Sequence, residues 1–256
     1  MDKLTVVKIG GQVIDNASDL KQFLSSFKAL PGHKILVHGG GKKATELSKK
    51  LGIEPKMIDG RRITDNDTLE VVTMVYGGLV NKNIVAQLQA IGENAIGLSG
   101  ADGNLIPATK RVHPTIDFGF VGDFEVANIN TVLLRSLLAQ NIIPVCCALT
   151  HDSQGNMLNT NADTLAAGLA QSVANQFETE LVYCFEKSGV LTDVDDENSL
   201  IKKLSFTTYQ KLKSDGKIAE GMIPKLDNAF QTHEKGVGVT IKNALQLNET
   251  TGTQLI

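Results

Sequence analysis

The sequence predicts an α/β protein, a three-layer α/β/α sandwich with an open, mostly parallel sheet and inserted β-hairpins. Short β-branched runs alternate with longer stretches of helical spacing along its 256 residues, which is typical of parallel sheets covered by helices on both faces. Hydrophobic residues make up 42% of the chain and charged residues 21%, as in globular proteins with a substantial core. Because crossovers in such folds are right-handed, ligands are expected along the edge where the strands end.

The expected strands are short apolar runs rich in β-branched residues, as buried parallel strands are. In chain order they are Leu4–Ile9, Lys34–His38, Ala95–Ser99, Ile142–Cys147, Glu180–Phe185 and Val237–Lys242. The expected helices repeat apolar residues every three or four positions. In chain order they are Leu20–Leu30, Lys42–Leu51, Asp67–Ala90, Asn130–Gln140, Asp163–Asn175 and Pro224–Lys235.

Two segments interrupt this alternation. Leu105–Asn128 combines Gly, Pro and Asp with short alternating runs, which favours β-hairpins inserted over the sheet. A second hairpin-like loop is expected through Asp193–Ser199. A boundary near Asn175–Glu180 divides the chain into a larger N-terminal lobe, residues 1–176, and a smaller C-terminal lobe, residues 177–256.

Composition and charge exclude several classes of partner. The net charge is −3, and no run of Lys and Arg is long enough to bind nucleic acid. No apolar stretch reaches membrane-spanning length and the first residues show no secretory pattern, so a cytoplasmic protein without a membrane partner is expected. Cys146 and Cys147 alternate along one strand, and with Cys184 they are interpreted as buried, reduced thiols. The five histidines lack metal-ligand spacing and the acidic run at 193–197 lacks the glycine of a calcium loop, so no metal site is expected.

Two strands end in glycines. The first reads Val6-Val7-Lys8-Ile9-Gly10-Gly11, and the second reads Leu36-Val37-His38-Gly39-Gly40-Gly41 before a helix that opens with two lysines. Glycines let backbone N–H groups approach an anion, and a helix N-terminus adds favourable dipole charge. Neither stretch has the P-loop ending or the spaced dinucleotide pattern. Both follow adjacent expected strands, so together they predict one anion-binding cradle; each alone could be a plain strand-to-helix turn.

Five ordered motifs spread over nearly the whole chain carry a family resemblance. They are Lys8-Ile9-Gly10-Gly11, His38-Gly39-Gly40-Gly41, Gly60-Arg61-Arg62-Ile63-Thr64, Asn159-Thr160-Asn161-Ala162-Asp163 and Gly221-Met222-Ile223-Pro224-Lys225. With these motifs the chain resembles the amino acid kinase family. Within that family the resemblance implies ATP-dependent phosphorylation of the γ-carboxylate of an N-acyl-glutamate, in arginine biosynthesis. N-acetyl-L-glutamate is the first candidate acceptor, and N-succinyl-L-glutamate is the alternative because these motifs do not specify the acyl group.

The resemblance assigns catalytic roles to three residues. Lys8 matches the lysine on the transferring phosphoryl group, Lys225 matches the lysine on the leaving phosphate, and Asp163 matches the aspartate that orients both. Two fixed cations and backbone N–H donors suit a transition state whose charge is spread over several oxygens. The plainer interpretations are a solvated helix lysine for Lys225 and a first-turn helix carboxylate for Asp163, with Asn161 as the cap.

The resemblance also assigns binding residues. Gly10, Gly11, Gly40 and Gly41 are expected to cradle the phosphoryl group. Gly40, Gly41, Arg62 and Asn159 are expected to bind the acceptor in the N-terminal lobe. Arg62 suits a bidentate clamp for the α-carboxylate, with its neighbour Arg61 expected in solvent. Asn159 suits an amide or carboxylate, or else simply forms a turn.

The nucleotide pocket is expected in the C-terminal lobe, where the sequence departs from the family. The family stretch is close to Leu-Thr-Asp-Val-x-Gly-Val, whereas this chain reads Tyr183-Cys184-Phe185-Glu186-Lys187-Ser188-Gly189-Val190-Leu191. Glu186 and Lys187 depart from it; together with Ser188, Gly189, Val190, Leu191 and Ala219 they are the expected nucleotide contacts. ATP is expected to arrive with Mg²⁺ held mainly by phosphates and water.

Two further expectations concern assembly and class. Arginine-inhibited relatives carry an extra N-terminal helix, and because the first strand starts near Met1 the resemblance implies a homodimer insensitive to arginine. Asp67–Ala90 is a candidate interface helix, although core packing explains it equally. A rival class is a non-catalytic amino-acid sensor on the same fold, which the joint presence of Lys8, Asp163 and Lys225 disfavours.

Overall fold

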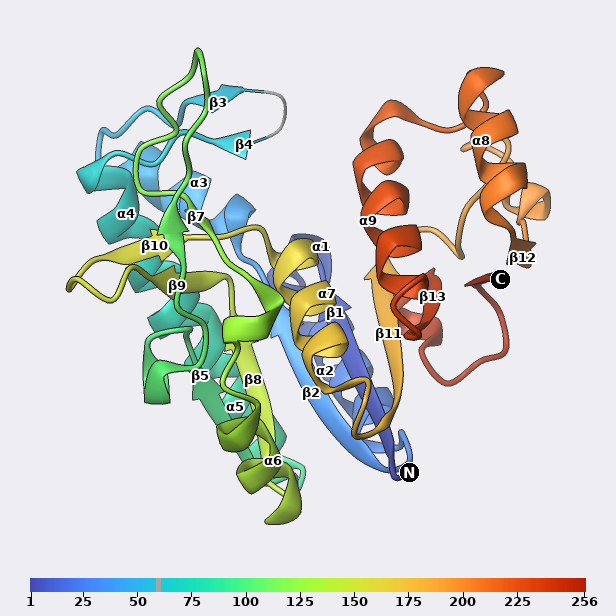
Figure 1. Cartoon of the computed structure of the whole chain (residues 1–256), viewed down its shortest axis with the longest axis horizontal. Helices are drawn as coiled ribbons and strands as arrows, with labels where there is room; N and C mark the ends of the chain where they lie inside the picture. The colour runs from blue at the N-terminus through green and yellow to red at the C-terminus, as the bar shows by residue number, and fades with distance from the viewer. Residues whose placement is uncertain (59–60) are drawn as a thin grey trace. The chain divides into compact units, whose positions relative to one another are not determined.

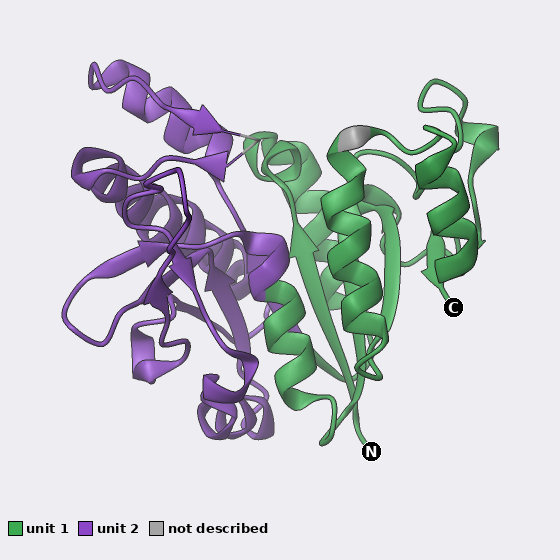
Figure 2. Ribbon diagram, turned by 45° about the horizontal axis from the view of Figure 1, so that its top comes forward, with its two compact units in different colours: residues 1–34, 166–256 green, residues 35–165 purple. Residues whose placement is uncertain are grey.

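A computed structural model describes residues 1–58 and 61–256 and confirms the predicted α/β class. The chain forms two compact units, which Figure 2 colours separately: unit 1 comprises residues 1–34 and 166–256, and unit 2 comprises residues 35–165. The predicted functional lobes, residues 1–176 and 177–256, have other bounds than these compact units, and their division of function stays a prediction. Gly60, the first residue of one family motif, lies outside the described residues.

Unit 1 is built on a mostly parallel sheet with strand order β12-β14-β13-β11-β1. Neighbours in it are parallel, except that β13 and β14 run antiparallel. The strands are β1 (Lys3–Ile9), β11 (Glu178–Phe185), β12 (Lys203–Leu204), β13 (Gly238–Asn243) and β14 (Thr253–Leu255). The helices are α1 (Gly11–Asp15), α2 (Ala17–Lys28), α8 (Phe206–Ser214), α9 (Ile223–His233) and the larger part of α7 (Ala162–Val173).

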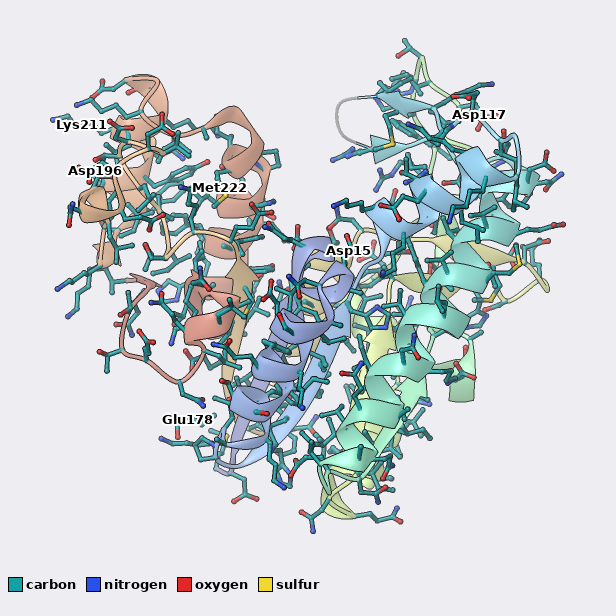
Figure 3. The ribbon with its side chains drawn as sticks, turned by 180° about the vertical axis from the view of Figure 1, so that it is seen from behind. Asp15, Asp117, Glu178, Asp196, Lys211 and Met222 are labelled. Atoms are coloured by element: carbon teal, nitrogen blue, oxygen red, sulfur yellow. The ribbon has the colours of Figure 1, made fainter. Side chains whose placement is uncertain are left out.

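Helices cover both faces of the unit 1 sheet, as Figures 1 and 3 show from opposite sides: α7 and α9 lie on one face and α2 on the other. Asn16 starts α2, because its Oδ1 accepts from the backbone N–H groups of Ser18 and Asp19. Phe23 and Phe27, one turn apart, are fully buried and stack with ring centroids 6.0 Å apart. Burial of this apolar stripe, more than helix propensity, holds α2 in place.

Unit 2 contains the parallel strand order β2-β8-β5 and three small antiparallel pairs. Its strands are β2 (His33–His38, from Ile35 on), β3 (Met57–Ile58), β4 (Arg61–Arg62), β5 (Ala95–Leu98), β6 (Thr109–Lys110), β7 (Gly122–Asp123), β8 (Ile143–Cys147), β9 (Leu149–His151) and β10 (Met157–Asn159). Its helices are α3 (Gly41–Lys50), α4 (Asn66–Val72), α5 (Asn81–Ala90) and α6 (Thr131–Ala139). The antiparallel pairs are β3 with β4, β6 with β7 and β9 with β10.

Of the β-hairpins predicted within Leu105–Asn128, one is confirmed, by the antiparallel β6–β7 pair. The hairpin-like loop expected through Asp193–Ser199 is confirmed, because an antiparallel bridge between Leu191 and Leu200 closes it. Asp193 and Asp196 shape this loop, since each carboxylate accepts from the backbone N–H two residues ahead and bends the chain there.

The expected helix Asp67–Ala90 is continuous but not uniformly α-helical. Between α4 and α5 lies a π-helical segment, η1 (Thr73–Val80), which contains Gly77 and Gly78. A Cβ atom on Gly77 would lie 3.6 Å from Leu149, so the backbone passes close to β9 there. No helix in the described part of the chain is long and apolar enough to cross a membrane.

Candidate active site

Unit 1 contains a cavity of about 700 Å³ at the carboxyl ends of β1 and β11. Four lysines and two carboxylates line it: Lys8, Lys187, Lys217, Lys225, Glu186 and Asp193. Apolar side chains line it too, among them Val13, Phe185, Val190, Leu191, Ile218 and Met222; Figure 3 labels Met222 at the start of α9. An excess of positive charge beside an apolar wall suits a ligand with phosphates and an aromatic base.

The two lysines expected to be catalytic both line this cavity. Lys8 is the second-to-last residue of β1 and is 8% exposed, and Lys225 lies in the first turn of α9. Their Nζ atoms lie over the same aromatic ring: 5.4 Å from the Phe185 centroid for Lys8 and 4.1 Å for Lys225. The structure therefore brings together two cations that are 217 positions apart in the sequence numbering.

Gly10 and Gly11 line the same cavity, where β1 ends and α1 begins. Gly10 is the N-cap of α1, and no side chain caps this end among the described contacts. A Cβ atom on Gly10 would have no heavy atom within 4 Å, so the backbone there faces open space. This is the geometry expected where backbone N–H groups approach a phosphate.

The residues that depart from the family pattern lie at the rim of the cavity. Glu186 lines it. When the amide nitrogen of Gln12 is turned towards this carboxylate, it donates to Glu186 at 2.6 Å. Lys187 also lines it and pairs with Glu197 at 3.2 Å. Ser188 donates to the same carboxylate at 2.6 Å and is not among the described lining residues. These two contacts lower the pKa of Glu197, with the Ser188 hydrogen bond the larger cause.

The remaining expected nucleotide contacts follow directly. Gly189, Val190, Leu191 and Ala219 all line the cavity. Gly189 cannot be larger without a rearrangement, because a Cβ atom would lie 2.6 Å from Thr253 Oγ1. That hydroxyl in turn accepts from the Val190 backbone N–H at 2.8 Å. The segment 189–191 is thus fixed against β14, while its other side faces the cavity.

Unit 2 holds the expected acceptor-binding residues. Gly40 is the N-cap of α3, and among the described contacts no side chain caps this helix end. A Cβ atom on Gly40 would lie 2.9 Å from the Tyr76 ring, which explains glycine at this position. His38 fixes the turn from the strand side: its Nδ1 lies 2.7 Å from the Gly39 carbonyl oxygen, and Asn81 Nδ2 lies 3.0 Å from its Nε2.

Arg62 is buried beside this turn. Its Nη2 donates to the Gly41 carbonyl oxygen at 2.9 Å and to Thr45 Oγ1 at 2.8 Å. Its Nη1 is buried and has no hydrogen-bond partner among residues 1–58 and 61–256, whereas the neighbouring Arg61 is exposed as expected. Burial of an unsatisfied guanidinium nitrogen is costly, so Nη1 is available for an anionic group of a ligand.

Asn159 is the last residue of β10 and donates from Nδ2 to Thr64 Oγ1 at 3.0 Å. It is therefore a buried strand residue, and the alternative of a turn-forming asparagine is wrong. Asp163 lies in the first turn of α7, whose start is capped as expected: Asn161 Oδ1 accepts from the N–H groups of Asp163 and Thr164. Since Asp163 belongs to unit 2 and both lysines to unit 1, its place between them stays a prediction.

Three side chains near these sites were not among the predicted site residues: Phe185, Gln12 and Tyr76. The Phe185 ring lies under the two lysines, Gln12 contacts Glu186, and Tyr76 packs on Gly40. Burial raises the pKa of Tyr76, which the nearby Arg62 guanidinium partly opposes. Phe185 could have been suspected, because it occupies the last position of a strand that ends at the ligand edge.

The cysteines agree with the sequence prediction. Cys146, Cys147 and Cys184 are free and buried, and burial raises the pKa of Cys147 and of Cys184 to about 12. Such thiols are poor nucleophiles and packing residues. Within residues 1–58 and 61–256, no group of three His, Cys, Asp or Glu side chains is arranged to hold a metal ion.

Comparison with known proteins identifies the class. The model of the amino acid kinase family matches residues 3–243, and the chain belongs to this family. A curated relative from Parabacteroides distasonis, named acetylglutamate kinase, is 52% identical over 256 residues and covers all of both chains. A relative of the same name from Cytophaga hutchinsonii is 53% identical over 264 aligned positions, covering 100% of this chain and 99% of its own.

Solved structures support the same fold. The crystal structure of smu.665 from Streptococcus mutans is 28% identical, with a TM-score of 0.78 over 98% of each chain. An N-acetylglutamate synthase from Neisseria gonorrhoeae, complexed with coenzyme A and N-acetyl-glutamate, has a TM-score of 0.83 at 22% identity. This chain is covered to 99% and the synthase to 59%, and at that identity the likeness concerns the fold alone. The family resemblance drawn from the five motifs is confirmed.

Proposed function

We propose that this protein transfers the γ-phosphoryl group of ATP to the γ-carboxylate of N-acetyl-L-glutamate, a step of arginine biosynthesis. Identity of 52% over the full length to a relative named acetylglutamate kinase supports the reaction and its acceptor. The structural observation that carries the proposal is the unit 1 cavity, where Lys8, Lys225 and the Gly10–Gly11 turn meet. A carboxylate oxygen attacks the γ-phosphorus, the bond to the bridging oxygen breaks, and ADP leaves.

The lysines supply the main electrostatic stabilisation in this proposal. Lys8 contacts the transferring phosphoryl group, and Lys225 contacts the leaving phosphate. The transition state spreads its charge over the transferred and leaving oxygens, so fixed cations stabilise it more than they stabilise the bound substrates. The attacking carboxylate is ionised at neutral pH, so the step needs no general base. Asp163 orients both ammonium groups, and Gly10, Gly11, Gly40 and Gly41 donate backbone N–H groups.

The acceptor is bound in this proposal by Arg62 and Asn159 beside Gly40 and Gly41. Arg62 Nη1, which is buried and has no hydrogen-bond partner in the described part of the chain, binds the α-carboxylate. Because Nη2 already bonds Gly41 and Thr45, the clamp is fixed before the acceptor arrives. Lys would not substitute, since a single ammonium cannot hold the turn and the carboxylate in this planar arrangement.

The nucleotide is bound in this proposal by the unit 1 cavity, with Mg²⁺ arriving on the phosphates of ATP. Val190, Leu191, Ala219 and Ile218 give the base an apolar wall, and Glu186 and Lys187 lie at the rim. We further assign acceptor binding to the lobe of residues 1–176 and ATP binding to the lobe of residues 177–256.

A cytoplasmic homodimer insensitive to arginine is the proposed assembly. The helical stretch 66–90 exposes two large apolar side chains, Met74 at 52% and Leu79 at 54%. Ile96, on the strand that ends the β2-β8-β5 order, is 38% exposed. An exposed apolar stretch of this kind is typical of a subunit interface.

A hydroxylamine trap for the acyl phosphate tests the reaction directly. Purified protein with MgATP is expected to form hydroxamate with N-acetyl-L-glutamate, and ADP release is expected to match it one for one. N-succinyl-L-glutamate run in parallel tests the alternative acceptor, and good turnover of it beside none of the acetyl compound would overturn the assignment. Tight acceptor binding without turnover of either compound would instead indicate a non-catalytic sensor.

A further inference from the structure

The Phe185 ring lies beneath both of the lysines to which the mechanism assigns charge stabilisation. Lys225 Nζ is 4.1 Å from the ring centroid and Lys8 Nζ is 5.4 Å from it. Both distances are within the range in which an ammonium group is attracted by the negative face of an aromatic ring. One ring therefore contacts two cations that come from a strand and from a helix.

Backbone register explains why the three side chains converge. Lys8 of β1 pairs with Tyr183 of the parallel strand β11, so the two side chains leave the sheet on the same face. Phe185, two residues further along β11, points to that face as well. The lysine then needs only to extend along the strand direction to reach the ring.

Neighbouring contacts fix the ring itself. Tyr183 and Phe185 stack with centroids 6.2 Å apart and an interplanar angle of 10°. Helix α9 covers the pair: Lys225 lies over Phe185, and Asn228, one turn later, lies 3.4 Å from the Tyr183 hydroxyl. Figure 1 shows α9 alongside β11. Two strand residues on the same face of the sheet thus meet two successive turns of one helix, which leaves the ring little freedom to rotate.

Placing two ammonium groups in one partly buried site is unfavourable, because like charges repel and both lose hydration. In the proposed mechanism the Asp163 carboxylate opposes part of that repulsion, and any further carboxylate close to the phosphates would also repel the substrate. An aromatic ring attracts both cations and carries no net charge. It can hold the lysines before ATP binds and compete only weakly with the phosphates afterwards.

We propose that Phe185 is a positioning residue whose ring holds the Lys8 and Lys225 ammonium groups in place for phosphoryl transfer. This inference rests on the roles proposed for the two lysines. Its main consequence is for kcat, because the lysines act on the transition state. Removing the ring while keeping an apolar side chain, as in Phe185→Leu, is expected to lower kcat about tenfold, and Phe185→Tyr is expected to restore most of it. Phe206→Leu, at a ring that packs on Tyr209 and Phe230, is the matched control.

The decisive experiment replaces Phe185 in the full chain with mono-, di- and trifluorophenylalanine. Fluorine withdraws charge from the ring face and changes its shape little, so cation–π attraction falls stepwise while packing is kept. We expect kcat to fall with each fluorine, by about tenfold over the series, while the KM for ATP stays within about twofold. A flat kcat across the series would show that the ring acts by shape alone and would overturn the proposal. A change confined to the KM for ATP would overturn it too, by making Phe185 a wall of the base pocket.

An NMR measurement separates this inference from the assignment of the lysines. The ring current of Phe185 is expected to shift the ε-methylene protons of Lys225 upfield, and Phe185→Leu is expected to abolish the shift. Ordinary chemical shifts in the unaltered protein would refute the contact whatever the activity. Shifted protons would confirm the contact. If Lys225→Ala nevertheless kept nearly full activity, the catalytic role of Lys225 would be refuted, and the positioning proposal with it.

Discussion

His38 makes the stability of this protein depend on pH in a way that can be calculated. The imidazole is fully buried, and burial lowers its pKa from the ordinary 6.5 to about 4. The Gly39 carbonyl oxygen can only accept, so Nδ1 carries the proton and Nε2 accepts from Asn81 Nδ2. The folded protein therefore holds a neutral imidazole, whereas the unfolded chain protonates it near pH 6.5.

The direction of this pH dependence follows from the number of protons that each state binds. Between the two pKa values the unfolded chain binds more protons, so the free energy of unfolding falls as the pH falls. One pKa unit corresponds to about 1.4 kcal/mol, so a shift from 6.5 to about 4 amounts to about 3 kcal/mol in full. About 2 kcal/mol of this is lost between about pH 7.5 and about pH 5, and the rest at lower pH.

Urea unfolding of the wild type and of His38→Gln tests this number. Gln keeps a side chain that can hydrogen-bond Asn81 but does not titrate, so subtracting the variant removes the contributions of the other histidines and of the carboxylates. The difference in unfolding free energy is expected to shrink by about 2 kcal/mol as the pH falls from about 7.5 to about 5. A pH-independent difference would refute the assignment of a neutral buried imidazole at the glycine turn.

The remaining predictions concern unit 2. Arg62→Lys is expected to raise the KM for the acceptor about ten- to hundredfold, because hydrogen bonds to charged groups are lost. Arg61→Lys, the control, is expected to change this KM by less than about twofold. Initial-rate kinetics compare the two variants, and equal effects would contradict the role of Arg62 as a clamp. Gly40→Ala places a Cβ atom 2.9 Å from the Tyr76 ring and is expected to lower the free energy of unfolding by about 1–3 kcal/mol. Urea unfolding measures this loss, and an unchanged unfolding midpoint would show that the turn can move aside. Leu79→Asp is expected to convert the proposed homodimer to a monomer in light scattering, and a monomeric wild type would refute the proposed interface.

Much of the fold follows from local sequence pattern. Buried parallel strands such as β1 and β11 are continuous apolar runs, and these runs predict the strands within a few residues. Helix α8 was missed because Thr207, Thr208 and Phe206 lower helix propensity; the structure starts it with Ser205, whose hydroxyl accepts from the Thr208 N–H. The π-helical segment η1 was also missed, because the sequence pattern predicted one uninterrupted helix over these residues.

The candidate site also has features that the sequence predicts and features that depend on tertiary packing. Glycine turns and charged residues were predictable, because anion binding needs those residue types wherever the chain folds. The contact of Phe185 with Lys8 and Lys225 was not, since it depends on the register of β1 with β11 and on the placement of α9. Likewise, the commitment of Arg62 Nη2 to Gly41 and Thr45 depends on tertiary packing and not on spacing.

The central claim is that Lys8 and Lys225 stabilise phosphoryl transfer to N-acetyl-L-glutamate. Single-turnover rates of Lys8→Ala and Lys225→Ala, measured at saturating MgATP and acceptor, test it most directly. Lys211→Ala is the control, because this exposed lysine lies on α8 and does not line the cavity in the described residues. The account predicts losses of about 10²- to 10³-fold for each of the first two variants and an unchanged rate for the control. A loss of less than about tenfold in either lysine variant would contradict it.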